Sequence, residues 1–70
     1  MTAKQVMALT AHDRLNYRGK TCRVVDWVGH LEPVFALDGT RIDAEPVFEF
    51  SNGLRHTIHS AFWGDIHKPV

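Results

Sequence analysis

The sequence predicts a mainly β fold, a small antiparallel barrel of five or six short strands. Turn dipeptides are the first observation: Asp-Gly at 38–39 and Asn-Gly at 52–53 lie between strand-forming runs, with a weaker Arg-Gly at 18–19. Asp-Gly and Asn-Gly supply the positive φ angles that tight two-residue hairpin turns require. Phe48 and Phe50 share one face of their run, the period-two pattern of a half-buried strand. In a chain of 70 residues, closing this meander into a barrel would remove its exposed edges.

The two ends of the chain add short helical elements to this prediction. Thr2, with a Gln three residues later, matches a capping box and favours a short helix, although residues 6–10 would also serve as a strand. Residues 60–63 are too few for a regular helix and predict a single helical turn before a last short strand. The expected organisation is an N-terminal helix or extension at 1–12 and a small β-barrel domain at 13–70.

The longest predicted strand spans residues 21–28. Strict alternation places Cys22, Val24 and Val28 on one face, interrupted by Asp26, and Arg23, Val25 and Trp27 on the other. Apolar side chains therefore occur on both faces. This is the pattern of a strand in a small barrel that is also partly covered on its outside.

Two segments resemble parts of known small barrels. The stretch Asp13–Lys20 (DRLNYRGK), followed by Arg23–Asp26 (RVVD), looks like the opening hairpin of SH3-like and Sm-like barrels. The closing stretch Ile58–Ile66 (IHSAFWGDI), a strand, a tight turn and a strand, is similar to the way those barrels end. The resemblance covers residues 13–68 at the level of architecture and implies an SH3-like or Sm-like barrel.

The formal net charge is zero, but the charges are unevenly distributed along the chain. Residues 1–30 carry a net +3, residues 31–50 carry −4, and residues 51–70 carry +1. One interpretation is that basic and acidic strands pair across the sheet. The other is a basic edge for an anionic partner and an acidic edge for a cationic one. A protein devoted to coating phosphates would usually be far more basic.

Cys22 is the single cysteine, so the chain cannot form an internal disulfide. No apolar run reaches the length of a signal peptide or of a membrane span. We therefore expect a cytoplasmic chain with no membrane partner. Its small core, without a disulfide, also suggests completion by oligomerisation or by a partner.

Histidine is the conspicuous residue type, with five in the chain: His12, His30, His56, His59 and His67. A zinc site needs three or four converging ligands, whereas His56 and His59 would point to opposite faces of one strand. Ser60, beside His59 and near Asp65, invites comparison with a catalytic triad, but sequence neighbours rarely form one. We expect no catalytic residue, no metal, no cofactor and no enzyme activity.

The function expected first is binding of a partner protein or of another copy of the chain. Phe62, Trp63 and Ile66 form a dense apolar cluster near the C-terminus, to which Trp27 is added. Aromatic side chains are frequent anchors of protein interfaces. The same rings would equally well close one end of the barrel. The prediction is a non-enzymatic binding module or regulator that uses these four residues.

The alternative is binding of RNA or single-stranded DNA through the basic hairpin 14–23. Its candidate residues interleave cations with one aromatic ring: Arg14, Tyr17, Arg18, Lys20 and Arg23. Small barrels hold single strands by stacking bases on rings and by placing cations along the phosphates. The acidic residues of the middle third weigh against this alternative without excluding it.

Overall fold

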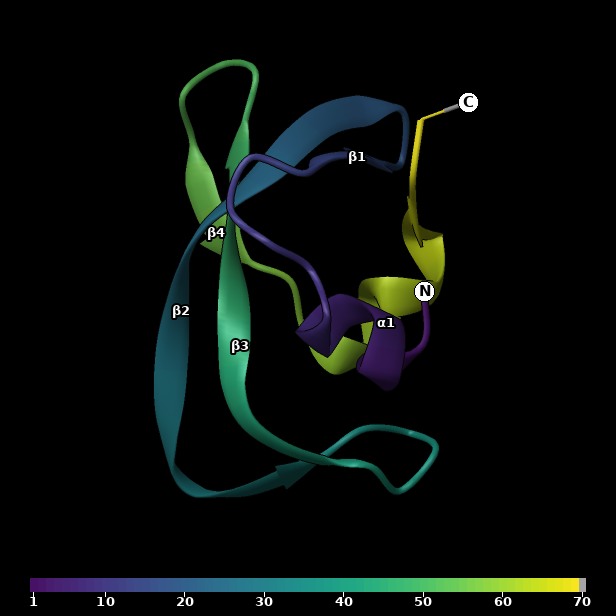
Figure 1. Cartoon of the computed structure of the whole chain (residues 1–70), viewed down its shortest axis with the longest axis vertical. Coiled ribbons are helices and arrows are strands. Elements are labelled where there is room, and N and C mark those ends of the chain that lie inside the picture. The colour runs from purple at the N-terminus through teal and green to yellow at the C-terminus, as the bar shows by residue number, and fades with distance from the viewer. Residues whose placement is uncertain (70) are drawn as a thin grey trace.

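The computed structural model describes residues 1–69, which form one five-stranded antiparallel sheet with two short helical elements (Figure 1). In chain order these are α1 (Ala3–Met7), β1 (Arg14–Tyr17), β2 (Lys20–Phe35), β3 (Arg41–Phe50), β4 (Arg55–Thr57), the 3-10 helix η1 (Ser60–Asp65) and β5 (Ile66–His67). The strand order is β4-β3-β2-β1-β5. The small, mainly β, antiparallel fold is thus confirmed. The β4–β5 pairing that would close a barrel is not among the strand pairs of residues 1–69.

The three predicted turns are present, but two of them are longer than expected. The Phe50 N–H donates to the Leu54 carbonyl at 2.8 Å, which leaves three loop residues between β3 and β4. Gly53 has a φ of 85° and donates its N–H to the Phe50 carbonyl. A turn followed by a residue with positive φ is the geometry of a three-residue hairpin loop. The β2–β3 loop, with Gly39 at φ 86°, follows the same pattern, so the glycines were correctly located and the loop length was wrong.

A β-bulge in β2 overturns the predicted alternation of its side chains. Val24 pairs with Phe48, but the next partner, Val47, lies opposite Asp26, so Val25 is an extra residue. After such a bulge the alternation shifts by one residue. Trp27 consequently lies on the same face as Val24, whereas the sequence had placed these two residues on opposite faces.

The second half of β2 and the first part of β3 form a bent hairpin, which we call the arm (residues 26–45). The pairing of β2 with β3 shifts again between Gly29 and Val34, where β2 holds more residues than β3. The strand turns sharply at this end of the molecule (Figure 1). We call residues 30–33 the β2 corner.

The core lies on the concave side of the sheet and is capped by both helical elements. The Thr2 hydroxyl accepts from the Gln5 N–H at 3.2 Å, and the Gln5 side chain accepts from the Thr2 N–H at 2.9 Å. This capping box confirms the N-terminal helix and rules out the alternative of a strand there. Two residues of α1, Ala3 and Val6, are buried in the core. The core consists of Ala3, Val6, Leu9, Leu15, Cys22, Val24, Ile42, Phe48, Ile58, Trp63 and Ile66.

Candidate binding cleft

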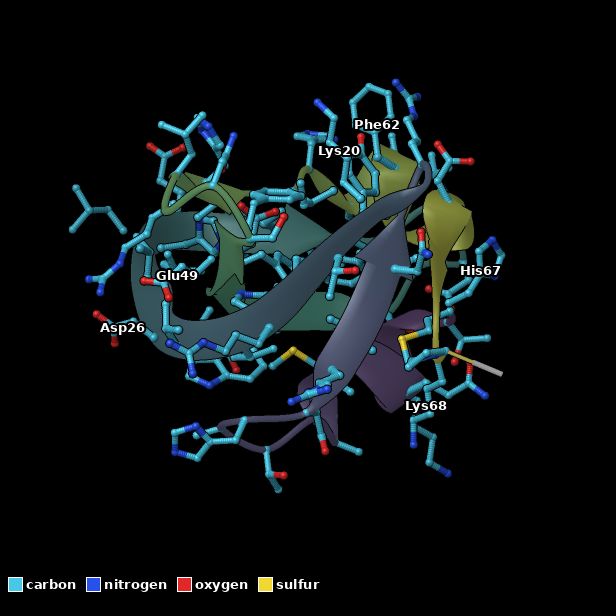
Figure 2. All side chains as sticks on the ribbon, turned by 90° about the horizontal axis from the view of Figure 1, so that it is seen from above. Lys20, Asp26, Glu49, Phe62, His67 and Lys68 are labelled. Atoms are coloured by element: carbon cyan, nitrogen blue, oxygen red, sulfur yellow. The ribbon has the colours of Figure 1, made fainter. Side chains whose placement is uncertain are left out.

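An open cleft of about 470 Å³ lies between the β1–β2 hairpin, the β3–β4 hairpin and η1. Ten residues line it: Tyr17, Lys20, Phe50, Asn52, Leu54, His56, Thr57, Ile58, His59 and Phe62. The volume is within the usual range of small-ligand sites, roughly 300–1,000 Å³. Lys20 and Phe62 stand together on one side of the molecule, away from Asp26 (Figure 2).

Aromatic rings form the walls of the cleft. The pairing of β1 with β2 and of β2 with β3 places Tyr17 and Phe50 on the concave face of the sheet. Their ring centroids are 6.2 Å apart, and the centroid of Phe50 is 6.1 Å from that of His56. On the η1 side Phe62 is 42% exposed. These rings offer flat apolar surfaces to a ligand.

Arg18 connects the β1–β2 hairpin to η1 at the edge of the cleft. Its backbone adopts a positive φ of 48°, as expected of a residue in a tight turn. Its guanidinium carbon lies 5.4 Å from the centroid of the Tyr17 ring and 5.0 Å from that of Phe62. The Nε of Arg18 also donates to the Asp65 carboxylate at 3.0 Å. Arg18 therefore contacts a ring on each side of the cleft.

The ionisable side chains that line the cleft are basic, apart from the Tyr17 phenol. Lys20, His56 and His59 are present, and no carboxylate is among the ten lining residues. The Nδ1 of His59 accepts a hydrogen bond from the Ala61 N–H at 3.3 Å, which leaves its Nε2 free of this interaction.

A second, shallower hollow of about 320 Å³ lies on the other side of the β3–β4 turn and shares Phe50 with the cleft. Arg14 and Arg23, opposite each other on β1 and β2, contribute to its lining. Arg23 also lies opposite Glu49 on β3, and Glu49 lies opposite Arg55 on β4. These four residues therefore form a row of charged side chains across the sheet. Arg23 and Arg55 each donate to Glu49 at 2.8 Å, and these bonds lower the pKa of the Glu49 carboxyl.

The structure divides the residues that were predicted to bind nucleic acid. Tyr17 and Lys20 line the cleft, and Arg18 lies at its edge. Arg14 and Arg23 belong to the second hollow, and Arg23 is already paired with Glu49. The candidate residues of the basic hairpin therefore lie on two separate surfaces rather than on one.

The residues that were predicted to bind protein are also separated. Trp63 is 2% exposed, and its indole N–H donates to the Ile58 carbonyl at 2.9 Å. Ile66 is fully buried, and Trp27 is partly buried against the core. Of these four residues, Phe62 alone is exposed, and it lies in the same cleft as Tyr17 and Lys20.

Sequence reasoning overlooked two groups of residues. Phe50 and His56 line the cleft, but the sequence pattern around them indicated only strands. Their positions on either side of the Asn-Gly turn were the one feature that could have identified them as neighbours. The exposed apolar side chains of the arm were also missed: Val28, Leu31, Phe35 and Leu37. The neighbouring acidic residues in the sequence were the available indication that these four side chains are not in the core.

The remaining chemical groups are used structurally. Cys22 is buried, and desolvation raises the pKa of its thiol, so it stays protonated at neutral pH. Asp65 is bound to Arg18 rather than to His59. Across residues 1–69 no cluster of three potential metal ligands occurs, and neither helical element has the length and apolar character of a membrane span.

No protein-family model, no curated protein and no solved structure matches the chain.

Proposed function

We propose that this chain is a non-enzymatic binding protein whose cleft takes single-stranded nucleic acid. The observation that carries the proposal is the composition of the cleft: three aromatic rings with Lys20 and two histidines, and no carboxylate in the lining. Bases have π faces that stack on such rings, and phosphates favour cations close by. The strand order and the short helical turn before β5 are in keeping with the SH3-like or Sm-like barrel that the sequence resembles.

The zero net charge does not oppose this proposal once the charges are located in space. The exposed carboxylates Glu32, Asp38 and Asp43 belong to the arm. The arm extends to the end of the molecule opposite the β3–β4 turn (Figure 1), whereas Asn52 and Leu54 of that turn line the cleft. An anionic strand in the cleft would therefore meet mainly basic residues.

The expected affinity is modest and only partly dependent on salt. Stacking of one base on an aromatic side chain contributes about 1–3 kcal/mol. Each phosphate contact of a single strand contributes a slope of about −0.7 in the dependence of log K on log salt. Lys20 lines the cleft, and Arg18 at its edge already pairs with Asp65, so at most a few such contacts are expected.

Fluorescence anisotropy with labelled ten-nucleotide oligo(U) and oligo(dT) tests the proposal, at protein concentrations low enough to keep the chain monomeric. Phe62→Ala should weaken binding about tenfold, the equivalent of roughly 1.4 kcal/mol of stacking. Phe35→Ala is the matched control, because it removes an exposed ring of the same chemistry from the arm. Equal affinities of the two variants, or no binding by the wild type, would refute the proposal.

A second candidate function is binding of protein, and a different observation favours it. Leu31, Phe35 and Leu37 on the arm are well exposed, although large apolar side chains in a small chain are needed for its core. Contiguous exposed apolar residues commonly mark protein interfaces. These residues do not include the predicted set around Trp63.

A further inference from the structure

The β2 corner exposes an apolar residue that is followed in the sequence by an exposed acidic residue. Leu31 is 105% exposed, the value of a side chain that contacts nothing around it. Glu32 is exposed as well and has no ion-pair partner among residues 1–69. Pro33 follows and restricts the backbone at this point. The corner thus presents a stiff apolar and anionic pair to solvent.

The molecule is electrically divided between the arm and the rest of the chain. Residues 26–45 carry five carboxylates and one arginine, a net −4, so the other residues carry +4 in a chain of zero net charge. Two arms placed against each other would bring together two −4 segments, which electrostatic repulsion opposes. A complementary surface must therefore lie outside the arm of a second molecule, where basic residues are in excess.

The cleft has the chemistry that the β2 corner requires. Its aromatic walls are apolar, and Lys20 lies on its lining with Arg18 at its edge. We propose that Leu31 and Glu32 of one copy dock in the cleft of a second copy, with Leu31 on the rings and Glu32 beside the cations. The arm lies at the end of the molecule opposite the β3–β4 turn (Figure 1), and Asn52 and Leu54 of that turn line the cleft, so the contact forms between molecules.

This contact would be head-to-tail, because it joins two different surfaces. Each copy then keeps one free cleft or one free corner, and growth continues unless the rotation closes a ring. The contact uses the same cleft as the proposed function but does not require nucleic acid to bind. Where both occur, they compete, and nucleic acid would release the arm of the neighbouring copy.

Two double variants separate the two surfaces in sedimentation equilibrium experiments. The corner variant carries Leu31→Ser and Glu32→Lys, and the cleft variant carries Lys20→Glu and Phe62→Ser. All four positions are exposed, so circular dichroism and thermal unfolding should resemble those of the wild type. The wild type should increase in mass with concentration, whereas each variant alone should remain monomeric, with association at least tenfold weaker.

The decisive sample is an equimolar mixture of the two variants. The cleft variant retains an intact corner, and the corner variant retains an intact cleft, so the mixture should form heterodimers and nothing larger. A monomeric wild type at all concentrations overturns the proposal, as does a mixture that stays monomeric. Dimerisation of the cleft variant alone would indicate arm-to-arm pairing and would also overturn it.

Oligonucleotide binding distinguishes this proposal from the proposed function. The corner variant should bind oligo(U) as well as the wild type does at low concentration, because its cleft is unchanged. If the wild type binds oligo(U) but never self-associates, the docking proposal is wrong and the proposed function stands. If it self-associates through these surfaces but ignores oligonucleotides, the reverse holds.

Discussion

The cleft and the arm both expose apolar side chains, but they do so in opposite ways. In the cleft, Phe62 is one wall of a hollow whose other rings contact the core and whose neighbours are cations. On the arm, Leu31 and Leu37 stand on an outer surface among carboxylates, and Leu37 is 87% exposed. In the roles proposed above, the first arrangement receives a ligand, and the second enters a site on another molecule. Exposed apolar area alone therefore does not identify a receptor surface.

The largest expected effect concerns two neighbouring rings of η1. Trp63→Ala removes a buried side chain and should lower the free energy of unfolding by about 3–5 kcal/mol, enough to unfold much of a chain this small. Phe62→Ala should lower it by less than about 1 kcal/mol, the size of its contact with Arg18. Urea unfolding followed by circular dichroism measures both. Similar losses would mean that the cleft wall cannot be separated from the core.

An intermediate effect separates the inner and outer faces of the arm. Ile42 is fully buried, and Ile42→Val should lower the free energy of unfolding by about 0.5–1.5 kcal/mol. Leu31→Ala, a larger truncation at an exposed position, should change it by no more than about 0.5 kcal/mol. Thermal unfolding of the monomer at low concentration gives the comparison. A larger loss at Leu31 would show that the β2 corner contacts its own chain.

The smallest effect concerns how the stability contributed by Glu49, between Arg23 and Arg55, depends on pH. Because Arg23 and Arg55 lower the pKa of Glu49 in the folded chain, the contribution of its charge is present above the ordinary pKa of 4.5. It is lost as the pH falls through the lower pKa of the folded state. Glu49→Gln should therefore lower the urea midpoint slightly at pH 7 and by less at pH 3. A larger difference at pH 3 would contradict this assignment.

The sequence predicted the turns well because their backbone geometry demands particular residues. Gly19, Gly39 and Gly53 all have positive φ, as glycine in these turns requires. The loop lengths were not predictable in the same way, because Asn-Gly and Asp-Gly fit both two-residue and three-residue hairpin loops. Which hydrogen bond forms is decided by the register of the whole hairpin.

The bulge and the cleft depended on information that a single sequence does not carry. Val24 and Val25 are chemically identical, so nothing local indicates which of them faces the core and which is the extra residue. Phe62 and Trp63 are likewise adjacent rings in one short helix, and tertiary packing decides that Trp63 is buried. The cleft arises where one of these rings, Phe62, meets residues from the four strands β1 to β4.

The pairing of β1 with β5 also has a consequence for the order of folding. Tyr17 lies opposite Ile66, so the edge of the first strand is covered only by the last one. Contacts that join distant parts of a chain form slowly, because a long loop must close first. During synthesis the β2–β3 hairpin can form early, whereas the cleft must wait for η1 and β5. A nascent chain would therefore expose its acidic arm before its cleft is formed.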